Sequence, residues 1–149
     1  MNKTSKKNYK TTHIYPSKKE ILNNLIETDK TLIKIFRGWM ATSWKKAKNK
    51  SEKQKFLALK ELIQVFAIHL ESPVLVEYKP SIASCCYSPS KKTIFLNNSL
   101  SIISSMHELG HHLLGESELL ACTWSLSYFI KAFPKSYAKL HWDGHLLRK

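Results

Sequence analysis

The residues best suited to chemistry stand together at His107-Glu108-Leu109-Gly110-His111, a His-Glu-x-x-His pattern. Residues four apart lie on one face of a helix, so both imidazoles can bind one metal ion. Zinc accepts such nitrogens at about 2.0–2.1 Å, and a catalytic site leaves one position for water. Glu108 is then placed to take a proton from that water, which predicts a hydrolytic zinc site. The alternative is an ordinary helix with two unmetallated histidines.

A zinc site of this kind needs a third protein ligand, because two histidines alone bind zinc weakly. Glu118 is the preferred candidate, since it follows the chain reversal expected at Gly115 and can return to the two imidazoles. Glu116 is the second choice, and His141 or His145 from the tail is the third. An acidic residue at position 118 can also simply stabilise a helix N-terminus.

Peptide hydrolysis also requires a hydrogen-bond donor to the developing oxyanion and a surface for the substrate. The candidate donors are Tyr128, Tyr137 and His145, among which the sequence does not choose. Residues 93–97 are expected to form an exposed sheet edge, which an extended substrate could join as a further strand.

The motif is expected on a helix that begins near Ser99 or Ser101 and ends at Leu114. Apolar positions along it predict a largely buried helix: Ile102, Ile103, Met106, Leu109 and Leu113. Gly110 costs about 1 kcal/mol of helix propensity relative to alanine. Because glycine has no side chain, we expect another backbone to pack closely against it. Gly115 suits the left-handed position that ends a helix.

A second helix is expected over residues 118–133, with Ser117 as its N-cap and Pro134 after its end. It is apolar on most sides and therefore reads as a core helix. Beyond it, the Asp143-Gly144 turn signal and the flanking aromatic residues predict a tail that packs onto the domain.

Two amphipathic helices are expected before the motif. A capping box at residues 17–20 opens the first, whose apolar spacing reaches Phe36 before Gly38 interrupts it. Ser51 and Gln54 form a second capping box, which opens a helix that ends before Pro73. His69 is expected as a helix-end or surface residue rather than a ligand.

Three β-type segments follow, at residues 74–79, 82–87 and 93–97, with a hairpin connection at 88–91. They predict a small antiparallel sheet between the first helices and the motif helix. The fold class is therefore α+β.

Composition predicts a folded domain over residues 17–149, preceded by a flexible basic arm at 1–16. Hydrophobic residues make up 43% of the 149 positions, and no run of 18 apolar residues could span a membrane. The lysine-rich start lacks the apolar region of a secretory signal. Cys85, Cys86 and Cys122 do not form a disulfide framework, so we expect buried thiols in the cytoplasm.

The net charge of +13 is concentrated in the first part of the chain. Residues 1–60 hold 16 lysines and arginines against 4 acids, whereas residues 61–149 hold 8 against 7. The domain thus divides into a basic helical part, 17–70, and a nearly neutral motif-bearing part, 74–149. Such an asymmetry favours an acidic partner such as nucleic acid, and its alternative is an ordinary lysine-rich surface.

Three segments carry a resemblance to a known family: residues 94–97 before the motif helix, 107–114, and 118–121 in the next helix. Together they resemble the ImmA/IrrE-like gluzincin group of small zincin metallopeptidases. The resemblance implies a minimal zincin-like fold, zinc bound by His107, His111 and Glu118, and Glu108 as the base. It also implies intracellular cleavage of a protein, often a DNA-bound repressor, in bacteria and their mobile elements.

The chain departs from this family in two respects. The family's Glu-Ala-Asn box reads Leu120-Ala121-Cys122 here, and the usual helix-turn-helix DNA-binding domain is absent.

The motif and the charge distribution together suggest two classes of function. The first is a zinc-dependent endopeptidase that hydrolyses a cytoplasmic protein, such as a regulator of a mobile element or phage. The alternative is a non-enzymatic, nucleic-acid-associated regulatory or anti-defence protein with structural zinc. Glu108 favours the enzyme, because structural zinc has no use for it.

Overall fold

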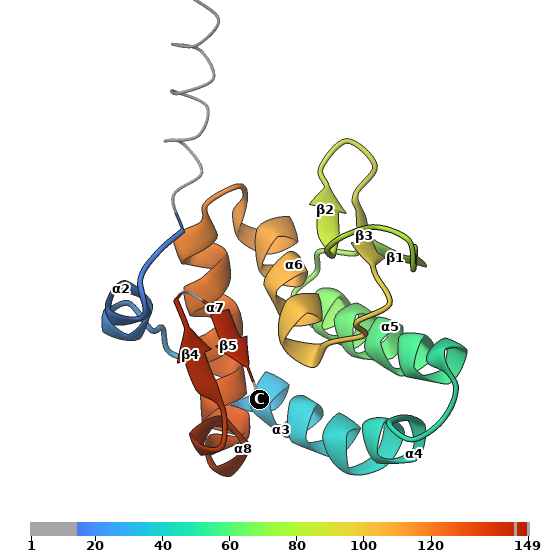
Figure 1. The fold of residues 1–149 in the computed structure, drawn as a ribbon, viewed down its shortest axis with the longest axis horizontal. Helices are drawn as coiled ribbons and strands as arrows, with labels where there is room; N and C mark the ends of the chain where they lie inside the picture. Colours follow the sequence, from blue (N-terminus) through green and yellow to red (C-terminus); the bar gives the residue numbers. More distant parts are fainter. Residues whose placement is uncertain (1–14, 145, 149) are drawn as a thin grey trace, which may run out of the picture.

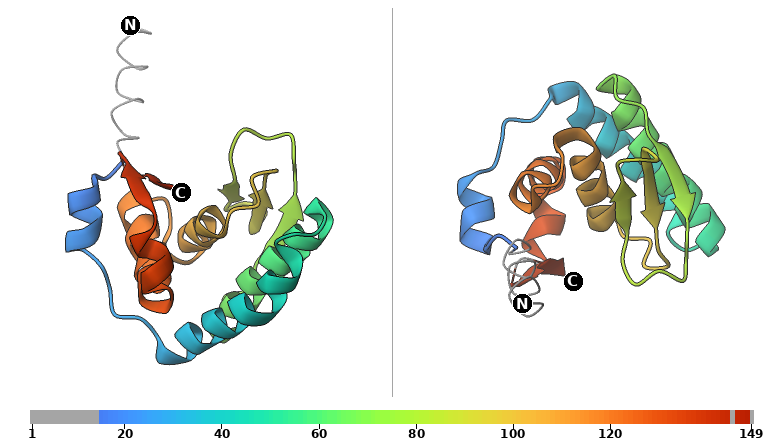
Figure 2. Two further views of the ribbon diagram at one scale, coloured as in Figure 1. Left: turned by 60° about the horizontal axis from the view of Figure 1, so that its bottom comes forward. Right: turned by 90° about the horizontal axis from the view of Figure 1, so that it is seen from above.

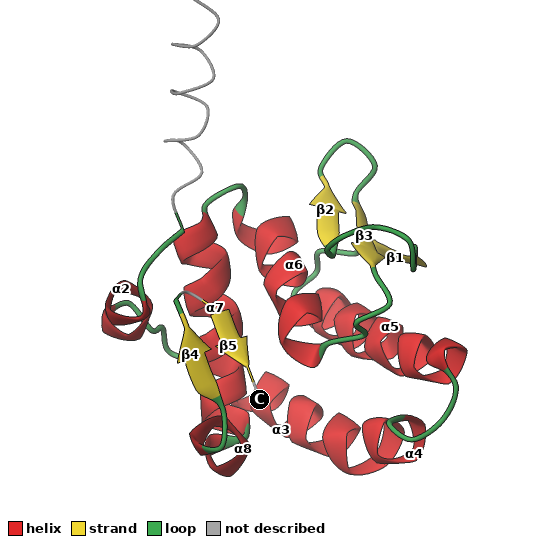
Figure 3. Cartoon of the chain, in the orientation of Figure 1, coloured by secondary structure: helices red, strands yellow, loops and turns green. Residues whose placement is uncertain are grey.

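A computed structural model describes residues 15–144 and 146–148, and its fold is α+β, as predicted (Figures 1 and 3). The expected basic arm lies almost wholly outside the described residues. The elements in chain order are α2 (Lys18–Asn23), α3 (Lys30–Trp39), a π-helical turn (Met40–Trp44), α4 (Lys45–Ala47), α5 (Glu52–His69), β1 (Leu75–Tyr78), β2 (Cys86–Ser88), β3 (Thr93–Leu96), α6 (Ile102–Leu114), α7 (Glu118–Ala132), α8 (Pro134–Ala138), β4 (His141–Asp143) and β5 (Leu146–Arg148).

The first predicted helix is two helices in the structure, because the connection between them bonds to a distant element. Ser17 and Glu20 form the expected capping box at the start of α2. The backbone N–H of Ile26 then donates to Ser127 Oγ at 2.9 Å, and that of Asp29 donates to Tyr128 Oη at 3.0 Å. Both acceptors lie on α7, so this segment has partners that a continuous helix would remove.

Gly38 does not interrupt a helix, contrary to the prediction. It lies inside α3, which continues through the π-helical turn into α4. Trp39 instead anchors this stretch to α5, since its indole N–H donates to the carbonyl of Ala58 at 2.8 Å. The tryptophan is therefore a core residue.

The three-stranded sheet is mixed rather than antiparallel. Its order is β1-β3-β2, with β1 parallel and β2 antiparallel to β3. The predicted exposed edge at residues 93–97 is wrong, because β3 is the central strand and all four of its residues are buried. A continuous apolar run is typical of such a strand. The free edges belong to β1 and β2 instead.

Helices α5, α6 and α7 share one hydrophobic core, in which the sheet packs on the side of α5 and α6 (Figure 2). The core helix predicted at 118–133 is observed as α7, most of whose residues are buried. Its Trp124 packs edge-on against Phe66 of α5, with ring centroids 6.1 Å apart. These contacts hold the motif helix between two neighbours.

The C-terminal tail packs down as predicted. Strands β4 and β5 form a hairpin whose turn contains Gly144 at φ +64°, a left-handed conformation that favours glycine. Leu147 on β5 packs against the core, and Trp142 donates its indole N–H to Tyr137 Oη at 3.2 Å. Within the described ranges, no helix combines the length and hydrophobicity needed to cross a membrane.

Candidate metal centre

Helix α6 presents both motif histidines on one face, as the spacing predicts. Ser101 is its N-cap, and its hydroxyl accepts from the backbone N–H of Ser104 at 3.2 Å. The imidazoles of His107 and His111 lie with centroids 4.7 Å apart and with nearly perpendicular planes. The imidazole nitrogens can therefore converge on one point.

Gly110 allows α7 to lie close beside this face (Figure 1). A Cβ atom at this position would lie 3.0 Å from Ala121 Cα and 3.1 Å from its carbonyl oxygen, closer than a Cβ atom normally packs, so α7 would have to shift to admit one. The expected close backbone approach is therefore present. Gly115 ends α6 at φ +93°, and Ser117 caps α7 by accepting from the N–H of Leu120. The reversal thus places Glu118 in the first turn of α7.

The carboxylate of Glu118 bridges the two histidines. Nε2 of His107 lies 2.9 Å from Oε1, and Nε2 of His111 lies 2.9 Å from Oε2. The structure therefore brings the three predicted ligands together. Of the alternatives, Glu116 and His141 are exposed and form no hydrogen bond or ion pair with the two histidines within the described part of the chain, and His145 lies outside it.

The donor set fits a metal ion on two grounds. Two imidazole nitrogens and a carboxylate are the ligands of many catalytic zinc sites. Nδ1 of His111 donates to the carbonyl of Gly115 at 2.8 Å, which fixes the ring and leaves Nε2 facing Glu118. A ligating histidine commonly donates its other nitrogen to such a carbonyl.

Cys122 is a member of this cluster that sequence reasoning missed. It lies one helical turn after Glu118, and its Sγ is 3.7 Å from Nδ1 of His107. Ligand atoms of His107, Glu118 and Cys122 all lie within 4.8 Å of one another. The spacing of four between Glu118 and Cys122 was a signal, because it places both side chains on one face of α7.

The pKa values of these groups reflect their mutual contacts in the metal-free protein. Burial lowers the pKa of His107, but hydrogen bonds with Cys122 and Glu118 raise it to about 10. The bond to Glu118 also raises the pKa of His111 above its ordinary value, against burial. Burial raises the pKa of Glu118, but its two histidine partners lower it to about 2. The metal-free cluster is thus an imidazolium–carboxylate network.

Glu108 is buried beside this network. Burial raises its pKa, while the charges of His107 and His111 oppose the shift. The backbone N–H of Tyr87 on strand β2 also lowers the pKa of Glu108, against burial. A buried carboxylate with a raised pKa suits the role of a general base near neutral pH.

His112 is a second residue that sequence reasoning missed. Its Nε2 lies 2.9 Å from the carbonyl oxygen of Ser72, and its Nδ1 lies 2.8 Å from Tyr87 Oη. A carbonyl only accepts, so Nε2 carries the proton and Nδ1 accepts from the phenol. His112 thereby ties strand β2 to helix α6. Its position on the motif helix was visible in the sequence, but its partners were not.

Two of the proposed oxyanion donors have other partners. Tyr128 Oη accepts from the N–H of Asp29, and Tyr137 Oη accepts from Trp142. Neither side chain is among those that line the cleft at the metal centre. The expectation that Tyr128 or Tyr137 serves the site is therefore wrong, and His145 lies outside the described residues.

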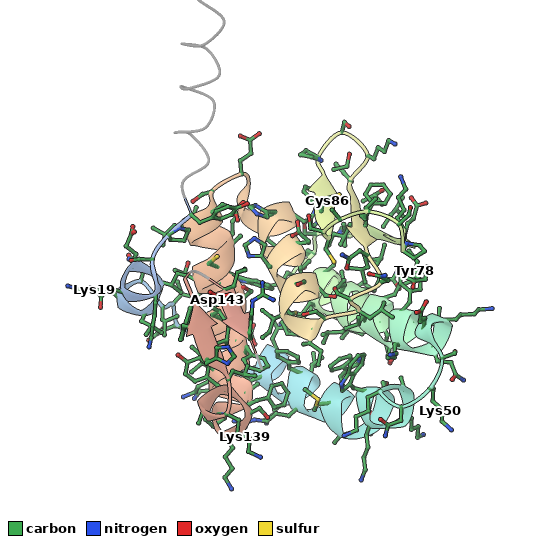
Figure 4. The ribbon with its side chains drawn as sticks, in the orientation of Figure 1. Lys19, Lys50, Tyr78, Cys86, Lys139 and Asp143 are labelled. Carbon is green, nitrogen blue, oxygen red and sulfur yellow. The ribbon has the colours of Figure 1, made fainter. Side chains whose placement is uncertain are left out.

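An open cleft of ≈ 1750 Å³ lies over the cluster. Its walls come from α6, α7, strand β2 and strand β5, and Cys86 marks the β2 side in Figure 4.

A scan against protein-family models, and searches of curated proteins and of solved structures, found no match. The functional argument therefore depends on the residues and geometry of this site.

Proposed function

We propose that this protein is a zinc-dependent endopeptidase that hydrolyses a protein substrate in the cytoplasm. One observation carries the proposal: the carboxylate of Glu118 meets Nε2 of both motif histidines at 2.9 Å, with Glu108 buried beside them. A structural zinc site would have no use for a buried glutamate at this point.

The site residues have distinct roles in the proposed reaction. Zinc held by His107, His111 and Glu118 would polarise the scissile carbonyl and lower the pKa of a bound water. Glu108 takes the proton from the attacking water and passes it to the leaving amine. The backbone N–H of Tyr87 lowers the pKa of Glu108 and so favours the ionised form that accepts this proton.

The cleft supports a polypeptide substrate. Its volume of ≈ 1750 Å³ exceeds the roughly 300–1,000 Å³ typical of small-molecule pockets. Strand β2 is an edge strand and borders the cleft, so its free edge can pair with an extended peptide. This edge replaces the one first expected at residues 93–97. The family resemblance suggests a regulator of a mobile element or phage as the substrate.

The decisive experiment compares zinc-loaded wild-type protein with Glu108→Gln on denatured bacterial proteins. New N-termini should appear with the wild type and be absent with the variant, which retains the ligands and should keep its zinc. Removal of zinc by a chelator should abolish cleavage, and zinc should restore it. Equal cleavage by Glu108→Gln, or no new N-termini at stoichiometric wild-type protein, would contradict the proposal.

A second candidate function, binding of nucleic acid, is favoured by the lysines of α4, of the turn that follows it and of the start of α5. Six of them stand at positions 45, 46, 48, 50, 53 and 55. None forms an ion pair in the described part of the chain, and the nearby acid Glu52 accepts from Tyr78 Oη. Figure 4 shows Lys50 at the turn between α4 and α5, away from Cys86 on β2.

The two functions are separable by experiment. Binding to a short random-sequence DNA duplex should fall steeply with salt if these lysines contact phosphates. Replacement of Lys46, Lys48 and Lys50 by glutamine should weaken binding, whereas Glu108→Gln should not. Binding without peptidase activity would favour the non-enzymatic class, and both activities together would indicate a protease localised on DNA.

A further inference from the structure

The two histidines of the centre differ in what contacts the nitrogen that faces away from Glu118. Nδ1 of His111 donates to the carbonyl of Gly115. Nδ1 of His107 instead lies 3.7 Å from the sulfur of Cys122, within the range of a hydrogen bond to sulfur. Outer partners of ligating histidines are normally carboxylates, backbone carbonyls or water. At this site the group beside Nδ1 is a thiol.

The contact is built into the packing of α6 on α7. The Gly110–Ala121 approach brings the helices together one residue before Cys122. Cys122 is 6% exposed, so the packing holds its side chain in place. Because Glu118 and Cys122 are four apart on α7, one helix face supplies both contacts of His107, the carboxylate to Nε2 and the sulfur to Nδ1.

We propose that Cys122 is a positioning residue that sets the tautomer and orientation of His107 for zinc, and that it is not itself a ligand. The inference rests on the proposed zinc site. The two nitrogens of an imidazole point in different directions, so a metal bound at Nε2 with Glu118 and His111 lies away from the sulfur at Nδ1. The thiol acts through the imidazole ring.

Zinc affinity is the direct readout, because it needs no substrate. Competition with a chromophoric chelator should show weaker zinc binding in Cys122→Ala by about 10–100-fold, the usual effect of losing an outer partner. Cys122→Asn, whose side-chain oxygen can accept from Nδ1, should restore much of the affinity. Cys86→Ala removes an exposed thiol that lines the same cleft and should bind zinc as the wild type does.

Cobalt substitution separates a positioning role from direct ligation. The cobalt form of the wild type should lack a thiolate-to-metal charge-transfer band. A band that disappears in Cys122→Ala would overturn the inference, and so would unchanged zinc affinity in that variant. Thermal unfolding of the metal-free variants shows whether Cys122→Ala merely disturbs the packing of α7. If it does, Cys122→Asn should fail to restore zinc binding, and the inference would also be wrong.

The inference and the proposed function can fail separately. If the wild-type protein binds no zinc, both the proposed function and the proposed role of Cys122 are wrong. Wild-type protein that binds zinc through His107 with an affinity independent of Cys122 would end only the inference.

Discussion

The phenol of Tyr87 donates a hydrogen bond to Nδ1 of His112 across 2.8 Å, and the two rings meet edge to face at 5.1 Å. The backbone N–H of the same tyrosine lowers the pKa of Glu108, against burial. Tyr87 thus joins the edge strand β2 to the motif helix, which carries the proposed base.

Loss of the phenol should loosen the strand without emptying the site. In Tyr87→Phe, Nδ1 of His112 loses its donor, so we expect the free energy of unfolding to fall by about 1 kcal/mol. Zinc binding should be unchanged, because no ligand contacts the hydroxyl. Tyr78→Phe is the matched control, since its phenol bonds to Glu52 away from the centre. Denaturant titration and metal analysis test both points, and loss of zinc from Tyr87→Phe would contradict them.

Metal content should follow the assigned roles. Purified protein should carry about one zinc per chain. His107→Ala should lose it, Glu118→Ala should bind it more weakly, and Glu108→Gln should retain it. Glu116→Ala, which removes an exposed acid two residues from Glu118, should behave as the wild type. Full zinc occupancy in Glu118→Ala would exclude that residue as the third ligand.

The metal-free protein should be most stable in mildly acidic solution. The pKa of His107 rises from 6.5 to about 10, so its contribution is complete below pH 6.5 and is lost as pH rises through 10. The pKa of Glu118 falls from 4.5 to about 2, so its contribution is complete above pH 4.5 and is lost as pH falls through 2. The cluster therefore stabilises the fold fully between pH 4.5 and 6.5.

Thermal unfolding with a chelator present tests this window. Glu118→Gln cannot form the ionised bridge, so its melting temperature should depend less on pH across both flanks. A wild-type curve that matches the Glu118→Gln curve would show that the network adds no stability. Zinc should change the pattern, because it displaces protons from the histidines and therefore binds more tightly as pH rises.

The two helical glycines should respond oppositely to alanine. In Gly110→Ala the new Cβ would meet the Ala121 backbone at 3.0 Å, and the strain should cost about 1–3 kcal/mol. It should also weaken zinc binding, because α7 carries Glu118. Gly38 has nothing within 4 Å of the same position, so Gly38→Ala should stabilise α3 by about 0.5–1 kcal/mol. Chemical denaturation measures the free energy of unfolding of both variants. Equal changes in Gly110→Ala and Gly38→Ala would contradict the prediction.

Local chemistry was enough to predict the motif helix and its surroundings. The Ser101 and Ser117 caps, the positive φ of Gly115 and the spacing of His107 and His111 all act within a few residues. Hydrogen bonds between near neighbours determine such features, so the sequence carries them directly. The proximity of Glu118 to the histidines also followed, because only a short reversal separates it from α6.

Only the tertiary structure decided which distant groups meet. The break between α2 and α3 depends on Ser127 and Tyr128, whose hydroxyls bind a backbone segment far away in the chain. The order of the sheet and the place of β2 beside the cleft depend on how strands pair, which a pattern of apolar residues does not specify. The contacts of Cys122 and His112 have the same origin. Side-chain spacing shows what a residue can do, and packing determines what it touches.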